Sequence, residues 1–370
     1  MQPGEAQKEN LTLQQRFNNF IVELQKPTLN EKATFFRLLA VSQKAGLGIR
    51  ASLVSLQQGQ ENKGMLMILE DMIQRLTAGS GLAEAMSYHA YFFTSEEIEL
   101  LKSTEITGNM SATLEEIADD LEANQIINAK VKKALTYPTL IIVFAVLAVV
   151  VLLIKVMPAI VTMYGDPEEL PGITKFMLNV SAFLQVNWWK CLILIFTLIT
   201  SYKLLYKYVL LFKIMIDTLM IKVPVVKNVV KLFYMHRFTV LLSQFYAAGV
   251  SPIISFNLLA NIFSNFCYKK KMIEVKNSIA SGFSIFESME GSDLFDPILI
   301  QIISVGENTG SLTDVLRKIS SFYLMSLNAA IDALTAIIEP FLMVGVAGMV
   351  GTLLGAIYLP MADMVNQISG

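Results

Sequence analysis

The amino-acid sequence predicts an all-α membrane protein with two repeated cytoplasmic six-helix bundles and three transmembrane helices. Three observations predict this fold class: an apolar composition, three long apolar segments, and an internal repeat that covers most of the chain. Of the 370 residues, 54% are hydrophobic and 16% are charged, whereas soluble domains average roughly 25% charged residues. The apolar excess indicates a lipid environment.

The first predicted element is an amphipathic helix in residues 1–29, which ends at Pro27. One face of this helix carries Leu13, Phe17, Phe20 and Leu24. That face either packs on the first bundle or docks on a partner or on the membrane surface. Because no apolar core follows a basic stretch here, we expect no secretory signal peptide and a cytoplasmic N-terminus.

The two bundles are predicted from helical periodicity and from helix-ending residues. In the first copy, segments 30–45, 61–78 and 112–133 carry apolar residues at three- and four-residue steps, which is typical of amphipathic helices. Thr94 and Glu97 match a capping box, a signature of a helix N-terminus. In the second copy Asp296 followed by Pro297 predicts the same helix start with different residues.

Three segments are long and apolar enough to cross a bilayer, which takes about 20 residues. The first has only apolar residues from Leu140 to Ile154, and the third has no charge between Pro340 and Leu359. The second has tryptophans at one end and lysines at the other, as interfacial residues do. The predicted spans are 137–158, 186–209 and 339–360.

Lysine and arginine distribution predicts the orientation of these spans. Three lysines precede the first span and a basic cluster follows the second, whereas the segment between them is acidic. The bundles should therefore lie in the cytoplasm and the C-terminus outside it. The remaining predicted boundaries are 30–136 for the first bundle, 159–185 for a short periplasmic segment, 210–338 for the second bundle and 361–370 for a periplasmic tail.

The internal repeat has a near-constant spacing. Gly46 matches Gly249 and Gly79 matches Gly282, each pair 203 residues apart. The second copy then lacks one residue, so the later pairs are 202 residues apart. The matches at 202 are Glu105 with Glu307, Gly108 with Gly310, Pro138 with Pro340 and Pro158 with Pro360. Matches at glycines and prolines, which end or interrupt helices, indicate a duplicated module.

Several classes of site are excluded by the residues present. No G-x-x-x-x-G-K-[ST] loop exists, so ATP hydrolysis would have to come from another protein. The two histidines and two cysteines have no metal-ligand spacing, and no metal, cofactor or catalytic residue is expected. A net charge of −2 argues against nucleic acid as a partner.

Small residues and prolines in the spans suggest packing or hinge roles. Gly351 and Gly355 form a G-x-x-x-G pair, which lets helices approach closely within one chain or between chains. Pro138 and Pro340 either start or kink their spans, because proline lacks a backbone donor. Pro158 and Pro360 occupy matching places at the other end of these spans.

Five segments carry a recognisable pattern: FFRLLAVSQKAGLGI (35–49), ALTYP (134–138), KVMP (155–158), LPGIT (170–174) and VGENTGSL (305–312). On these segments the chain resembles the inner-membrane platform proteins of type IV pilus and type II secretion systems. The resemblance covers about residues 35–365. The first copy departs from the last motif, because Thr104 stands where the family pattern has a glycine before the acid.

The resemblance implies a non-enzymatic platform that forms a homo-oligomer over a hexameric cytoplasmic assembly or retraction ATPase. It further implies contacts with inner-membrane alignment proteins and with pilin or pseudopilin subunits. We favour a pilus machine, with type II secretion as the alternative. A small transporter or channel is the competing class, but it would need ionisable residues at mid-membrane.

The acids Glu105 and Glu307, each followed by a glycine three residues later, have two interpretations. In the structural one, each carboxylate is stabilised by the positive pole of the next helix while Gly108 or Gly310 makes a left-handed turn. In the functional one, which the resemblance permits, one or both loops contact the ATPase or a neighbouring subunit.

Overall fold

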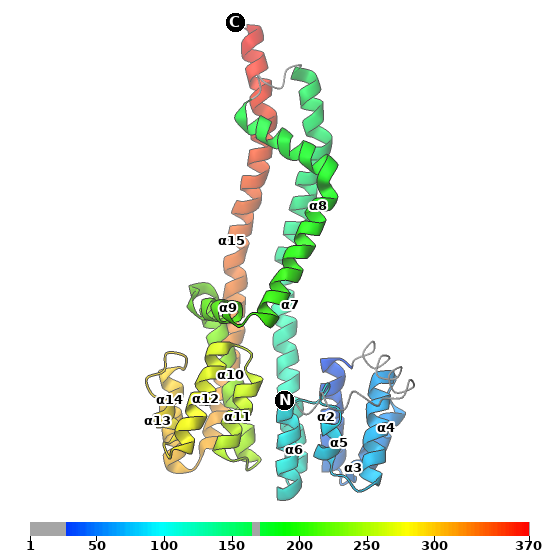
Figure 1. Cartoon of the computed structure of the whole chain (residues 1–370), viewed down its shortest axis with the longest axis vertical. Helices are drawn as coiled ribbons and strands as arrows, with labels where there is room; N and C mark the ends of the chain where they lie inside the picture. The colour runs from blue at the N-terminus through cyan, green and yellow to red at the C-terminus, as the bar shows by residue number, and fades with distance from the viewer. Residues whose placement is uncertain (1–26, 165–170, 370) are drawn as a thin grey trace. The chain divides into compact units, whose positions relative to one another are not determined.

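The computed structural model describes residues 27–164 and 171–369, and these residues form α-helices and no strand. The all-α fold class is confirmed. The predicted N-terminal helix falls in residues 1–26 and the acidic loop residues in 165–170, outside the described residues. Figure 1 labels the helices, which are α2 Leu29–Lys44, α3 Ile49–Gln58, α4 Lys63–Thr77, α5 Leu82–Ser87, α6 Ser95–Thr107, α7 Met110–Tyr164, α8 Gly172–Tyr208, α9 Leu210–Lys222, α10 Pro224–Ala247, α11 Pro252–Ile262, α12 Phe266–Ala280, α13 Ile285–Met289, α14 Pro297–Thr309 and α15 Leu312–Ser369.

Helix boundaries repeat with the spacing that the sequence predicts. Helices α4 and α12 are 203 residues apart at both ends, and α6 and α14 are 202 residues apart at both ends. The described part of each copy contributes six helices: α2 to α6 with the start of α7, and α10 to α14 with the start of α15. The predicted pair of six-helix bundles is therefore confirmed.

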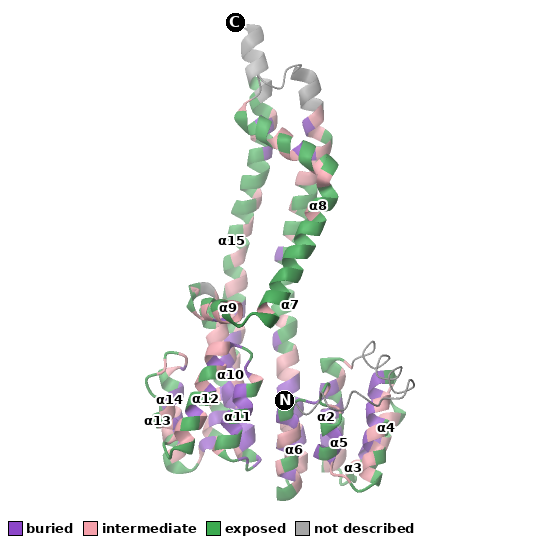
Figure 2. Ribbon diagram, viewed as in Figure 1, coloured by how far each residue is buried: buried purple, intermediate pink, exposed green. Residues whose placement is uncertain are grey.

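The chain divides into two compact units. The first unit comprises residues 1–128 and 230–327 and holds both bundles. The second comprises residues 129–229 and 328–370 and holds the long apolar helices. In Figure 2 the buried residues concentrate in the short bundle helices, whereas α8 is mostly exposed.

Helix starts follow from capping side chains. The Thr94 side chain accepts from the backbone of Glu97, and the Glu97 side chain accepts from Thr94 in return, so the predicted capping box is present. Asp296 caps α14 with Pro297 in the first turn. Helix α2 starts just before the predicted segment 30–45, because Thr28 caps it and pairs with Glu31 in a second capping box. Asn30 is also a residue type that caps well, so sequence spacing alone could not choose between the two.

Aromatic residues fill the core of each bundle. In the first, Phe35, Phe36 and Phe93 are buried and form edge-to-face and tilted contacts. In the second, Phe238 packs against Phe256 and Phe295. Each such pair adds about 0.5–1.5 kcal/mol beyond the area it buries.

Among the described residues, three helices are long and apolar enough to cross a membrane, as predicted: α7, α8 and α15. Helix α8 begins at Gly172, so much of the segment expected to be a short periplasmic connection is helical, and it bends at Asn187 where the predicted second span begins. Before that bend, the Thr174 hydroxyl donates to Ala356 O at 2.9 Å and the Ser181 hydroxyl donates to Leu153 O at 2.5 Å. Helix α9, predicted as part of the second bundle, belongs to the second unit.

Candidate functional site

The acid Glu307 holds the start of the short helix α13. Its two carboxylate oxygens accept from the backbone N–H groups of Ile285 and Phe286, both at 2.8 Å. A helix N-terminus has N–H groups without intrahelical partners and carries partial positive charge. The carboxylate therefore supplies the partners that α13 itself lacks.

The acid Glu105 does the same in the first copy with one bond. Its Oε1 accepts from Ala83 N at 3.1 Å, and a Cβ on Gly81 would lie only 2.8 Å from its Oε2. The expected stabilisation at a positive helix pole is present in both copies. The expected partner was wrong, because the carboxylate binds the preceding helix rather than the next one.

The glycines that follow these acids end their helices in a left-handed conformation. The φ angle is +79° at Gly108 and +67° at Gly310, a region that costs other residues roughly 1–2 kcal/mol. The paired turn glycines of the repeat share this geometry: Gly46, Gly249, Gly79 and Gly282 all have positive φ.

The structure explains why Thr104 replaces a glycine in the first copy. At the equivalent position, a Cβ on Gly306 would lie 2.9 Å from the Cα of Leu312. Thr104 is fully buried, and its hydroxyl lies within hydrogen-bond distance of the carbonyl oxygens of Leu100 and Leu101. The α6–α7 turn thus has room for a side chain that the α14–α15 turn lacks.

A buried ion pair distinguishes the first bundle from the second. Lys32 Nζ lies 2.6 Å from Glu97 Oε2, and both side chains are almost completely buried. Burial raises the pKa of Glu97, and the Lys32 ammonium opposes this rise. The positions of this pair in the second bundle hold Met235 and Leu299, both fully buried.

A second group of buried charges joins the two bundles within the first unit. Arg237 Nη1 on α10 donates to both oxygens of Asp120 on α7, at 3.0 and 2.7 Å. Its Nη2 lies 3.5 Å from Glu96 Oε1 on α6. A buried guanidinium with two carboxylates fixes geometry, and removing one member of such a group costs several kcal/mol.

Three further contacts complete this bundle junction. Gln244 Nε2 donates to Glu116 O at 3.0 Å, Ser103 Oγ donates to Ala248 O at 2.6 Å, and Arg317 pairs with Glu116. We name its first-bundle side the α6–α7 face, which consists of Glu96, Ser103, Glu116 and Asp120. We name its second-bundle side the α10–α15 face, which consists of Arg237, Gln244, Ala248 and Arg317.

Burial displaces the pKa values of titratable groups at the junction, Glu96 and His236 among them. Burial raises the pKa of Glu96 to about 7; Arg237 opposes the rise and Asp120 adds to it. Burial lowers the pKa of His236, whose Nδ1 lies 3.1 Å from Ser320 O. Within the described part of the chain, His236 Nε2 is buried without a hydrogen-bond partner. The neutral imidazole is therefore the favoured form.

The prolines and glycines expected to shape the spans lie inside continuous helices. Pro138 and Pro158 are interior to α7, and Pro340 lies inside α15, so neither Pro138 nor Pro340 starts a helix. Pro360 is also within α15, although its side chain lies outside the described residues.

The G-x-x-x-G pair makes no close contact in the described part of the chain. A methyl group added at Gly351 or Gly355 would meet no atom within 4 Å. Helix α15 instead packs through Leu353 and Ala356, against Leu153 and Met157 of α7. Its packing inside the chain therefore does not use the two glycines.

The described residues show no metal centre. They contain no group of three or more His, Cys, Asp or Glu side chains that could hold an ion, and Cys191 and Cys267 form no disulfide there. The clusters of polar residues described above hold helix ends and hold one bundle against the other.

Sequence reasoning missed the junction. Arg237 belongs to the basic cluster that predicts the orientation of the spans. Its partners in the junction lie 117 and 141 residues away in sequence. The repeat contains a signal that could have found it. At the equivalent positions Arg237, Glu96 and Asp120 become Thr34, Ile298 and Phe322, so charge appears in one copy alone.

Comparison with known proteins agrees with the duplication. The model of the family "Type II secretion system (T2SS), protein F" matches residues 35–158 and again residues 238–360. The type IV pilus assembly protein PilC of Pseudomonas aeruginosa is 29% identical over 338 residues, which cover 91% of this chain and 90% of that protein.

Two other relatives match almost the whole chain. The type IV pilus assembly protein PilC of Myxococcus xanthus is 31% identical over 90% of this chain and 80% of its own length. The type II secretion system protein F of Vibrio cholerae is 25% identical over 91% of this chain and 83% of its own length. With two family matches, two equivalent bundles and three apolar helices, the chain belongs to the type II secretion system protein F family.

Proposed function

We propose that this chain is the inner-membrane platform of a type IV pilus assembly machine, which couples a cytoplasmic ATPase to the insertion of pilin subunits into the fibre. The observation that carries the proposal is the end-to-end match to relatives named for type IV pilus assembly, at about 90% coverage of this chain. A platform also fits a chain whose buried polar groups fix helices in place.

Two continuous helices make such a platform mechanically plausible. Helix α7 has 55 residues and α15 has 58, and each combines bundle residues with an apolar segment in one unbroken element. At 1.5 Å per residue, each measures about 80 Å or more. Each helix therefore connects bundle residues to an apolar segment by continuous helical backbone.

We propose the topology that the charge distribution predicts, with the N-terminus and both bundles in the cytoplasm and the C-terminus outside it. Cysteine labelling or reporter fusions at exposed positions test this topology. A reporter near Ile285 on the periplasmic side would overturn the proposal, because a cytoplasmic motor could not reach the second bundle.

The partners proposed are a hexameric ATPase, pilin, and the inner-membrane alignment proteins. The loop after α14, which contains Gly310, is the part of the acid–glycine motif that remains available to a partner or neighbouring subunit. The corresponding loop after α6 already lies against the second bundle, where Thr107 Cγ2 is 4.0 Å from the Cβ position of Gly249.

Deletion of the gene distinguishes the pilus proposal from its alternative. Loss of surface fibres, with normal export of secreted enzymes and co-purification of a hexameric ATPase, is the expected result. Intact fibres with secreted proteins retained in the periplasm would instead assign the chain to type II secretion, the system for which the Vibrio cholerae relative is named. Solute uptake by proteoliposomes would refute both.

A further inference from the structure

The bundle junction joins two different faces, although the bundles are copies of one another. The α6–α7 face belongs to the first bundle and the α10–α15 face to the second. Because the fold is repeated, each face has a counterpart on the other bundle at a spacing of 202 or 203 residues. A contact between two different faces can repeat from one chain to the next, because each chain carries both faces.

The two counterparts form surfaces that nothing in the described chain covers. The open α14–α15 face consists of Ile298, Val305, Lys318, Phe322 and Met325, which correspond to Glu96, Ser103, Glu116, Asp120 and Ala123. The open α2–α7 face consists of Thr34, Leu38, Val41, Ala45 and Glu115, which correspond to Arg237, Leu241, Gln244, Ala248 and Arg317.

Burial differs sharply between equivalent positions. On α10, Leu241 is 1% exposed and Gln244 is 7% exposed, whereas Leu38 and Val41 on α2 are 44% and 57% exposed. The same contrast holds on the other side of the contact. Glu96 is 8% exposed, but its counterpart Ile298 is 54% exposed.

The open α14–α15 face also carries larger apolar side chains than its counterpart, the α6–α7 face. Phe322, 47% exposed, replaces Asp120, and Val305, 57% exposed, replaces Ser103. Met325 is exposed as well. A cluster of exposed large apolar residues on a folded domain marks an interaction surface.

Charge is complementary across the open faces. Inside the chain, Glu116 of the α6–α7 face pairs with Arg317 of the α10–α15 face. Their counterparts are Lys318 and Glu115, so the contact would keep opposite charges with the signs reversed. Glu115 already pairs with Lys44 of its own chain at 3.2 Å, and its side chain stays 44% exposed, so Lys318 would be its second partner. Such complementarity selects the partner and the register of the contact.

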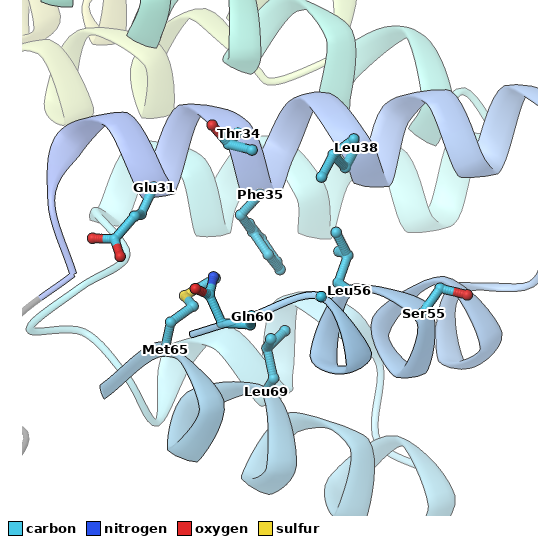
Figure 3. A pocket seen from close by; sticks show the side chains of 10 residues that line it. Glu31, Thr34, Phe35, Leu38, Ser55, Leu56, Gln60, Met65 and Leu69 are labelled. Carbon is cyan, nitrogen blue, oxygen red and sulfur yellow. The ribbon is translucent and has the colours of Figure 1, made fainter. Parts of the chain in front are cut away.

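The open α2–α7 face includes a hollow beside Thr34 and Leu38. Figure 3 shows this pocket of about 260 Å³ between α2, α3 and α4, with Phe35 pointing into it. In the second bundle the positions of Gln60 and Met65 hold Phe263 and Tyr268, which are buried. At these positions the first bundle therefore has a hollow where the second has buried aromatic side chains, and this hollow lies opposite the place that Phe322 would take.

We propose that the open α14–α15 face of one chain docks on the open α2–α7 face of a second copy of this chain, and so repeats the bundle junction between chains. The proposal commits to a second copy because both sides of the contact are present on the same polypeptide and continue the contact already made within it. Membrane anchoring holds the copies in one layer, where such a heterologous contact forms a ring if the rotation between neighbours closes and an open row if it does not. The inference does not depend on which machine the chain serves.

Disulfide cross-linking in native membranes tests the contact. Because Ser103 Oγ lies 2.6 Å from Ala248 O within the chain, its counterparts Val305 and Ala45 should approach closely between chains. Two differently tagged full-length chains, one Val305→Cys and one Ala45→Cys, are co-expressed with Cys191 and Cys267 replaced by serine. An oxidant should then give a covalent pair of chains.

Two controls make this result decisive. Ser103→Cys with Ala248→Cys in a single chain must form an internal disulfide, which shows that the oxidant works at the junction. Gln74→Cys, exposed on α4, replaces Ala45→Cys as the control for random collision. Absence of the covalent pair while the internal disulfide forms, or equal yield with Gln74→Cys, would overturn the proposal and leave the open faces to another protein.

Transplanting the buried ion pair provides an independent test. Phe322→Asp alone should abolish the assembly of full-length chains extracted in mild detergent, whereas Phe322→Asp with Thr34→Arg should restore it, because this pair copies Asp120 and Arg237. Phe283→Asp, at an exposed phenylalanine outside both faces, should leave the assembly mass unchanged. Failure of the double variant to reassemble, with each variant folded by circular dichroism, would contradict the register proposed.

Discussion

The buried pair Lys32–Glu97 allows a prediction that the protein's own second copy specifies. Replacing both residues by their counterparts, Lys32→Met and Glu97→Leu, exchanges an ion pair for the apolar pair that Met235 and Leu299 form in the other bundle. We expect the double variant to be as stable as the natural chain within about 1 kcal/mol, or more stable.

The magnitude follows from the burial of both groups. The ion pair is 2.6 Å long and almost fully buried, so removing one member leaves an uncompensated charge, which costs about 3–5 kcal/mol. Removing both eliminates that penalty. One loss remains, because Glu97 Oε2 also accepts from Thr94 N at 2.8 Å, a capping contribution of about 1 kcal/mol. Adding Thr94→Asp, the residue of the second copy, should recover it.

Hydrogen exchange of the full-length protein in micelles measures these effects. The amides of α2 and α6 report the opening free energy of the first bundle. Each single substitution should lower it by about 3 kcal/mol or more, while amides of α12 serve as an internal control and stay unchanged. If the double variant loses as much as the two single variants together, the two copies do not share a core and the reasoning fails.

Two further predictions concern acids at the site. The folded pKa of Glu96, about 7, lies above its ordinary value of 4.5, so its contribution to stability is fully present below pH 4.5 and is lost as pH rises through 7, by about 3 kcal/mol. Glu96→Gln should flatten the pH dependence of α6 exchange between pH 5 and 8, with the exposed Glu84→Gln as control. An unchanged slope would contradict the raised pKa. Glu307→Ala should speed exchange at Ile285 and Phe286 by removing two charge-assisted bonds, a loss of about 2–3 kcal/mol, and Glu105→Ala should have a smaller effect at Ala83; equal effects would argue against the difference in bond number.

Most of the fold was predictable because its determinants are local. Helix ends at Gly108 and Gly310 and starts at Thr94 and Asp296 depend on residues within one turn, and the repeat doubles each signal. The start of α8 was not predictable in this way. Residues 172–185 are only moderately apolar, and Thr174 and Ser181 hold them through carbonyl groups of other helices, which hydropathy does not report.

The bundle junction could not be predicted from the sequence of either copy taken alone. Arg237 has no charged neighbour in sequence that identifies Asp120 as its partner, and basic residues before a span are common on orientation grounds alone. The distinguishing feature is a difference between copies, since a charge that is absent from the equivalent position has no role in the shared fold. Such differences mark the surfaces where one copy meets something that the other does not.

Gly306 provides the converse case, in which the copies differ inside the shared fold. The Cβ of Gly306→Ala would lie 2.9 Å from the Cα and from a side-chain carbon of Leu312, and a backbone atom cannot move aside as a flexible side chain does. We expect a loss of about 1–3 kcal/mol, seen as faster exchange at the start of α15. Thr104→Gly should cost about 1 kcal/mol from helix propensity without disturbing the α6–α7 turn. If Gly306→Ala left stability unchanged, close approach at this turn would not explain the glycine that precedes the acid in the second copy. The space around Thr104 would then not explain why the first copy has a threonine at the same position.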